Sequence, residues 1–455
     1  MPPVFGHATI PNPRIKGSEY RGFIASDSMI DNVQSTTLPN GVVVLTEHMP
    51  GLRSVTVGIW VRRGSRHESA NLNGLCHFIE HTVFKGTQRR SARDIAIESD
   101  RLGGHLDAYT THEMTGFALK VADNHLSQAV DLLADLVSRP KFDPADLERE
   151  QKVILEEMKM VEDTPDELLG ELFNAAYFPD QALGRPIEGT RETVSSFDQQ
   201  ITASFHAREF STRNLVIAAA GNVDHDNLVD MVERLIPDPT LEGDGSQELF
   251  LANGSPTAAA PILIEQKRDL EQAHLIIAAP WPTALSADRY AASLLASILG
   301  GGTSSRLWQR IREERGLAYS VGAGGNTFSD VGVFTIYAGT SPAHLDEVLD
   351  LSLEELRRVV RENVTEDELN IAKDQAISSI LLGLESTSAR ASTLARQEII
   401  HHRRISPDEV VRKIESVDRM QLQEVAQSSF TTERIALGAL GNLNGFRVDR
   451  SRLEI

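Results

Sequence analysis

The stretch GLCHFIEHTVFKGT, residues 74–87, decides how the rest of the chain is interpreted. His77 and His81 are four residues apart, so in a helix their side chains lie on one face, one turn apart. Two imidazoles at that spacing can bind a single zinc ion. Glu80 lies on the same side, where its carboxylate can reach a water on such a metal. The alternative is a helix that carries two surface histidines and a chance glutamate.

Composition indicates a globular protein of two or more domains. The chain has 455 residues, of which 41% are hydrophobic, enough for substantial cores. No apolar run reaches the roughly 18 residues of a membrane span, and the first 31 residues resemble neither a signal peptide nor a transit helix. We therefore expect a bacterial cytoplasmic protein, with a mature organellar form as the alternative.

The net charge and the cysteine count bear on the kinds of partner and on whether the protein is held by disulfide bonds. A net charge of −20 argues against nucleic acid as a partner and favours basic ligands, although plain solubility is the better explanation of the charge alone. The single cysteine, Cys76, rules out an internal disulfide framework. We expect its side chain to pack as a small apolar residue.

Hydrophobic periodicity predicts an alternation of strands and helices. A strand, an Asn-Gly turn and a second strand are predicted over residues 35–47. Further strands are predicted at 54–61, 105–109, 114–121, 214–222, 261–266, 274–279, 319–324, 332–339 and 435–442. Helices are predicted around His77 and at 91–102, 126–137, 144–161, 167–176, 199–210, 226–235, 288–299, 304–314, 342–360 and 366–384.

The order of these elements occurs twice, about 220 residues apart, which indicates duplication of one domain. LVIAAAGN at 215–222 is echoed by IALGALGN at 435–442. The expected fold class is therefore α+β, with two tandem homologous domains, each a mostly antiparallel sheet flanked by helices. The predicted division is an irregular arm (1–31), a zinc-binding catalytic domain (32–236), a linker (237–261) and a second domain without the motif (262–455).

Zinc held by two histidines needs a third protein ligand and an open position for water. The helix predicted at 144–161 carries the best candidates. Spacing alone leaves four of its carboxylates open: Glu148, Glu150, Glu156 and Glu157.

Three stretches, HFIEHTVFKGT at 77–87, GGHLDAYTTHE at 103–113 and EREQKVILEEM at 148–158, resemble the pitrilysin/insulinase family of inverted-motif zinc peptidases. The likeness is closest to mitochondrial processing peptidase β-type subunits and their bacterial relatives, and it covers nearly the whole chain after residue 31. In that family the third ligand follows the second histidine by about 76 residues. The resemblance thus implies one Zn²⁺ per chain on His77, His81 and Glu157, with Glu150 in support.

The resemblance also implies a catalytic mechanism and an assembly. Glu80 would take a proton from the attacking water and pass it to the leaving amine. Arg312 and Tyr319 match the family's Arg–Tyr pair, which two-domain members supply from a partner subunit; a surface arginine and a core tyrosine are the alternative. We therefore expect a clam-shaped homodimer, or a heterodimer with a related subunit, with each chain forming half of a closed chamber.

Substrate contacts are implied on an edge strand and on a helix. The peptide would add as a strand along Gly104, His105, Leu106, Asp107, Ala108 and Tyr109, although Asp107 replaces the family's usual Asn. A strand paired inside the sheet is the alternative. Glu167 and Glu171 match acids that receive an arginine in processing peptidases, or they form a solvated helix face.

The leading hypothesis is that the protein is a zinc metalloendopeptidase that cleaves extended peptides inside its chamber and favours basic residues near the cut. The alternative is a non-catalytic structural or partner subunit of a processing-peptidase-like or respiratory assembly. Such relatives typically lose zinc ligands, whereas this chain keeps the full set.

Overall fold

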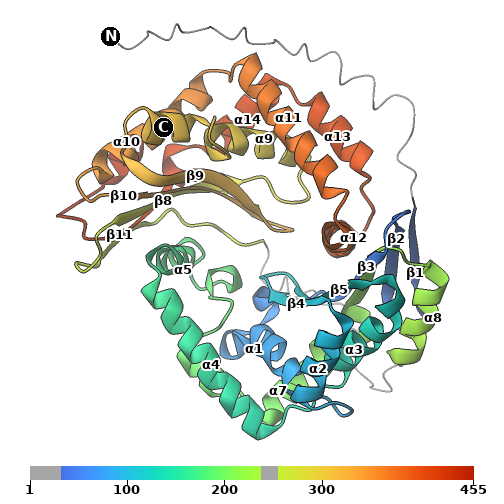
Figure 1. Ribbon diagram of the computed structural model, residues 1–455. Helices are drawn as coiled ribbons and strands as arrows, with labels where there is room; N and C mark the ends of the chain where they lie inside the picture. Colours follow the sequence, from blue (N-terminus) through green and yellow to red (C-terminus); the bar gives the residue numbers. More distant parts are fainter. Residues whose placement is uncertain (1–31, 237–254) are drawn as a thin grey trace, which may run out of the picture.

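The computed structural model describes residues 32–236 and 255–455 (Figure 1). The predicted arm at 1–31 and most of the predicted linker, 237–254, lie outside the described residues. Residues 255–261 contain no helix or strand and lead into the second sheet. No helix in the described part of the chain is long and apolar enough to cross a bilayer.

The first domain is built on a six-stranded sheet in the order β1-β2-β6-β3-β5-β4. All neighbours are antiparallel except β2 and β6, which are parallel. Its strands are β1 (Val33–Thr37), β2 (Val43–His48), β3 (Ser54–Val61), β4 (His105–Thr110), β5 (Thr115–Ala122) and β6 (Leu215–Gly221).

Eight helices belong to the first domain among the described residues. They are α1 (Leu75–Thr82), α2 (Ala92–Leu102), α3 (Leu126–Ser138), α4 (Pro144–Asp163), α5 (Pro165–Tyr177), α6 (Arg191–Ser195), α7 (Gln199–Glu209) and α8 (His225–Leu235). The face of β3 that carries Val55, Val57 and Ile59 packs with the helices into one core. Successive side chains of a strand point to opposite faces, so Trp60 lies in a second core on the other side.

The second sheet repeats this plan with one strand fewer, in the order β7-β11-β8-β10-β9. Here β7 and β11 are the parallel pair, as β2 and β6 are in the first sheet. The strands are β7 (Ile262–Gln266), β8 (Ala273–Trp281), β9 (Ala318–Thr327), β10 (Gly332–Thr340) and β11 (Ala436–Gly441). The predicted fold class, two tandem domains of sheet and helix, is confirmed.

The helices of the second domain include three that the sequence analysis did not predict. They are α9 (Arg289–Gly300), α10 (Leu345–Arg361), α11 (Glu366–Gly383) and the unpredicted α12 (Thr387–His401), α13 (Pro407–Ser416) and α14 (Arg419–Ser429). The helix predicted at 304–314 is shorter and forms a π-helix at Trp308–Glu313.

Each domain contributes one helix that packs on the sheet of the other domain. Helix α5 of the first domain packs on β8 and β11 of the second sheet (Figure 1). Leu169 and Phe173 of this helix share a buried cluster with Ile276. Helix α12 of the second domain packs on β2, β3 and β6, where Leu394 joins Trp60. Each helix buries apolar surface against a sheet of the other domain, so the two domains hold each other in place.

Candidate metal centre and active site

Helix α1 carries its apolar side chains on one face and its polar side chains on the other. Leu75, Cys76, Phe78 and Ile79 are fully buried in the first core. The opposite face turns toward α4 and β4, against which α1 packs, and carries the three residues of the motif, His77, Glu80 and His81. Cys76 is a buried free thiol, as expected, and burial raises its pKa well above the ordinary value.

Helix α4 brings Glu157 to both histidines. The Glu157 Oε2 atom lies 3.9 Å from His77 Nε2 and 3.7 Å from His81 Nε2. One ligand atom from each residue lies within 4.8 Å of the others. Ligand atoms that each sit about 2.0–2.2 Å from a zinc ion are about 3–4 Å apart, so a small contraction of this group would accommodate the metal.

A buried oxygen without a hydrogen-bond partner indicates that His77, His81 and Glu157 could hold a cation. Glu157 Oε2 is buried and accepts no hydrogen bond from any described residue, and His77 Nδ1 is likewise unpaired. An unsatisfied buried carboxylate oxygen costs free energy unless a cation or a donor meets it. Two imidazole nitrogens and a carboxylate are the donor set of a catalytic zinc site, so the residues fit zinc.

The other carboxylates that spacing left open on α4 are placed elsewhere. Glu148 and Glu156 are mostly exposed and pair with Lys152 and Lys159 along their own helix, at 2.8 and 2.5 Å. Surface pairs of this kind contribute little to stability and indicate no further role.

Glu150 is buried beside the second histidine. Its Oε2 atom lies 3.4 Å from His81 Nδ1, and its Oε1 atom accepts a bond of 2.8 Å from Lys85 Nζ. Burial lowers the pKa of His81, but the hydrogen bond to Glu150 and the charge of Glu157 raise it overall. A carboxylate on the second ring nitrogen orients an imidazole and leaves Nε2 to face the metal position, which is a supporting role.

Glu80 is held by the neighbouring edge strand. Thr110 Oγ1, at the end of β4, donates a hydrogen bond of 2.7 Å to Glu80 Oε2. Burial raises the pKa of Glu80, and the bond from Thr110 partly opposes this effect. A carboxyl group with a raised pKa is a stronger base once it is ionised, which suits proton transfer near neutral pH.

Strand β4 is the last strand of its sheet and, among the described strands, pairs only with β5. It contains the predicted substrate residues from His105 to Tyr109. His105 and Asp107 are exposed, whereas Tyr109 is half-buried and accepts a 2.8 Å bond from Trp60 Nε1. Gly104 precedes the strand, where a Cβ atom would collide with the carbonyl oxygen of Lys120.

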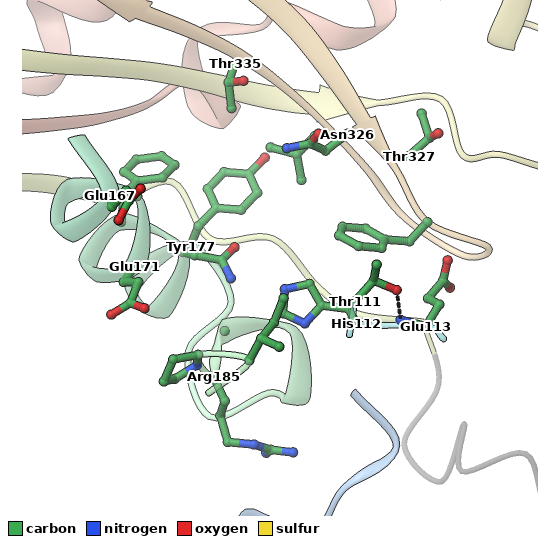
Figure 2. A pocket seen from close by; sticks show the side chains of 18 of the residues that line it. Thr111, His112, Glu113, Glu167, Glu171, Tyr177, Arg185, Asn326, Thr327 and Thr335 are labelled. Atoms are coloured by element: carbon green, nitrogen blue, oxygen red, sulfur yellow. Dashed lines mark hydrogen bonds between the residues drawn. The ribbon is translucent and has the colours of Figure 1, made fainter. Parts of the chain in front are cut away.

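A cavity of about 1000 Å³ opens between the two domains (Figure 2). Its walls include α5, residues 184–188, the turn between β4 and β5, strands β9 and β10, and helix α12. Glu167 and Glu171 both line it, from one face of α5. Burial, together with the nearby carboxylates of Glu188, Glu167 and Glu162, raises the pKa of Glu171 to about 7.

Arg312 and Tyr319 lie together, but not at the metal group. The Arg312 guanidinium carbon is 4.0 Å from the centre of the Trp308 ring and 5.1 Å from that of Tyr319. Tyr319 is 78% exposed. Within the described ranges, neither Arg312 nor Tyr319 contacts the three candidate ligands or lines the cavity.

Sequence reasoning missed three side chains that complete the site: Lys85, Thr110 and Glu188. Lys85 follows His81 by four residues, a spacing that could have suggested a contact on the same face. Thr110 and Glu188 gave no comparable signal, because their positions depend on how a strand and a loop pack against α1 and α5.

The sequence is similar to a known protein family and to several bacterial proteins. Residues 43–191 match the family described as insulinase (peptidase family M16), and residues 196–376 match the peptidase M16 inactive domain. An uncharacterized zinc protease of Mycobacterium leprae is 39% identical over 406 residues, covering 89% of this chain and 91% of the relative. One from Bacillus subtilis is 35% identical over 406 residues, covering 88% and 96%.

Solved structures share the fold. A protease from Helicobacter pylori superposes with a TM-score of 0.82 at 20% identity, covering 90% of this chain and 99% of that one. A structure described as the peptidase M16 inactive domain from Pseudomonas fluorescens gives 0.83 at 20% identity, with 90% and 98% covered. At this identity the likeness concerns the fold alone.

Proposed function

The chain belongs to the insulinase family, peptidase family M16, and on that premise we propose that it is a zinc metalloendopeptidase that cleaves extended peptides. The observation that carries the proposal is the unpaired Glu157 oxygen, which faces two imidazoles with Glu80 on the same helix face. An oxygen in that position is costly in a protein that binds no cation.

His77, His81 and Glu157 would hold one Zn²⁺ per chain, and the bound ion would supply the Lewis acidity that peptide hydrolysis needs. Glu150, held by Lys85, orients the His81 ring through its Nδ1 atom. Glu80, fixed by Thr110, takes the proton of the attacking water and returns it to the leaving amine. Strand β4 offers its unpaired edge to the main chain of an extended substrate.

A non-catalytic subunit of a processing or respiratory assembly is the competing proposal. A subunit that catalyses no reaction has no need to keep three metal ligands beside a general base. All three candidate ligands and Glu80 are present and grouped here, which favours the enzyme.

Metal removal tests the proposal directly. Incubation with a zinc chelator is expected to lower cleavage of a quenched fluorogenic peptide by more than about 100-fold, since metal catalysis contributes several kcal/mol. Added Zn²⁺ should restore the parent rate, and metal analysis should give one ion per chain. Cleavage that survives complete chelation, or purified chain that retains no zinc when supplied with it, would contradict the proposal.

We propose further that the acids of α5 accept a basic side chain near the cut. In a peptide panel, replacing an upstream arginine by alanine should lower kcat/KM by about 10-fold or more, the worth of a charge-assisted hydrogen bond. The raised pKa of Glu171, about 7, adds a pH dependence, because this carboxyl becomes negative only above that pH. The ratio of the rates for arginine and alanine peptides should therefore increase from pH 6 to pH 8.

Glu171→Gln should lower that ratio and remove its pH dependence, whereas Glu148→Gln, on the exposed side of α4, should change neither. A ratio that is independent of pH and equal in parent and Glu171→Gln would refute the basic subsite.

We also propose a dimer in which Arg312 and Tyr319 act on the partner's site, because in one chain they form a pair away from the metal group. His77→Ala and Arg312→Ala should each be inactive alone. When the two variants are refolded together, half of the dimers are mixed and each has one complete site, so about a quarter of parent activity should return. Co-refolding His77→Ala with Glu157→Gln is the control and should restore nothing. No recovery in the first mixture would exclude action in trans.

A further inference from the structure

The start of α1 lacks a cap of its own. Its N-cap residue, Gly74, has φ of 96° and no side chain, and the first turn contains no acidic residue. The first N–H groups of a helix have no partner within it, and they form the positive end of its dipole. A helix of eight residues depends strongly on such partners, because short helices are marginal by themselves.

Glu68, six residues before this start, supplies what is missing. Its Oε2 atom accepts a hydrogen bond of 2.7 Å from the Gly74 N–H, and its Oε1 atom accepts one of 2.6 Å from the Cys76 N–H. The Asn73 amide donates a longer bond of 3.3 Å to Oε2. Glu68 is only 4% exposed, so these bonds form without competition from water.

The same short segment is fixed to the second domain. Arg66, in the 3₁₀ turn Ser65–His67, donates to both oxygens of Asp330, at 2.9 and 2.7 Å, and to Glu113 at 2.9 Å. Asp330 lies in the turn between β9 and β10. Glu113 also accepts bonds from the N–H and hydroxyl of Ser329, at 3.0 and 2.6 Å. The partners of Arg66 therefore join the β4–β5 turn to the second domain.

We propose that Glu68 is a positioning residue that fixes the first turn of α1, so that His77 and Glu80 face Glu157. The peptide unit that donates to Glu68 Oε1 immediately precedes that of His77, so its position limits where the imidazole can go. Arg66 makes this placement depend on the contact between the two domains. The catalytic part of the inference rests on the proposed function, whereas the effect on α1 does not.

The test compares Glu68→Gln and Glu68→Ala with Glu355→Gln. Glu355 is a matched control, since it is a buried glutamate of the second domain that pairs with Arg310 at 2.6 Å. Burial raises the pKa of Glu68 to about 7. The measurements are therefore made at pH 8, where this carboxyl is ionised in the parent. Glu68→Gln keeps the size of the side chain and one acceptor oxygen, so it should fold even where Glu68→Ala does not.

The first readout is hydrogen exchange of the α1 amides in metal-free protein. Weaker hydrogen bonds from the Gly74 and Cys76 N–H groups should speed exchange at residues 75–82 by about 10-fold in Glu68→Gln, which corresponds to about 1.4 kcal/mol of local stability, and leave β3 unchanged. Glu355→Gln should leave the exchange of α1 at the parent rate.

The second readout is function. The zinc dissociation constant should increase by about 10–100-fold, as for other lost supporting contacts. The value of kcat should fall while KM changes less than about 2-fold, since Glu68 touches no substrate. Unchanged α1 exchange in Glu68→Gln, or equal loosening of α1 in Glu355→Gln, would overturn the inference. If Glu68→Gln speeds α1 exchange but the parent protein neither binds zinc nor cleaves peptides, the result would support the role of Glu68 in fixing α1 and refute the proposed function.

Discussion

Glu80→Gln is expected to lower kcat for peptide cleavage by about 10³-fold, within the range that a lost general base produces, and to leave zinc content at one ion per chain. Glutamine has the shape of glutamate and can still accept the hydrogen bond from Thr110, so the local structure should persist. Its amide cannot take up a proton at neutral pH. The loss should therefore appear in the chemical step and not in folding or in metal binding.

Three measurements check this result: single-turnover cleavage of a fluorogenic peptide, metal analysis and thermal unfolding. Glu156→Gln is the control, because this residue lies on α4 near the same site but is mostly exposed and pairs only with Lys159. It should cleave at the parent rate. A Glu80→Gln variant that turns over as fast as the parent, with zinc bound, would remove Glu80 from the mechanism.

Glu157→Gln should abolish metal binding and activity together. It replaces the one anionic ligand of the candidate group by a neutral amide, and His77 and His81 alone make a poor zinc site. We expect affinity for zinc to fall by more than about 100-fold, beyond the 10–100-fold typical of supporting residues. The neighbouring Glu156→Gln differs by one position and should bind zinc as the parent does.

Competition with a chromogenic chelator measures both affinities, and the thermal shift on adding zinc gives an independent reading. Zinc should raise the Tm of the parent and of Glu156→Gln, because a ligand that binds only the folded state stabilises it, and should leave Glu157→Gln unchanged. If Glu157→Gln kept parent affinity while Glu156→Gln lost it, the ligand would be Glu156.

Local patterns predicted most elements of the first domain, because each follows from its own residues. Asp143 caps α4 and Pro144 begins it, and both residue types are favoured at these positions of a helix. The choice among four carboxylates on that helix could not be made from spacing, since it depends on which face of α4 meets α1. The resemblance pointed to Glu157, and in the structure that residue lies beside both histidines.

Contacts that need the order of strands or the path of loops were not predictable. That β4 forms the edge of its sheet follows from β5 pairing with β3 on one side and β4 on the other, although β4 comes before β5 in the chain. Glu68 lies in a polar loop, and no local pattern separates it from a solvated acid. Helix α12 was missed because its sequence has many small and charged residues, while its burial comes from the first sheet.

The reciprocal placement of α5 and α12 has a bearing on the ancestry of the chain. The two helices hold equivalent positions, each directly after the long helix of its own repeat, α4 or α11. Two separate copies of a single repeat could cover their sheets in this way by trading one helix each, as swapped homodimers do. Gene fusion would then have joined partners that were already paired, leaving one copy free to lose its histidines while the other kept them.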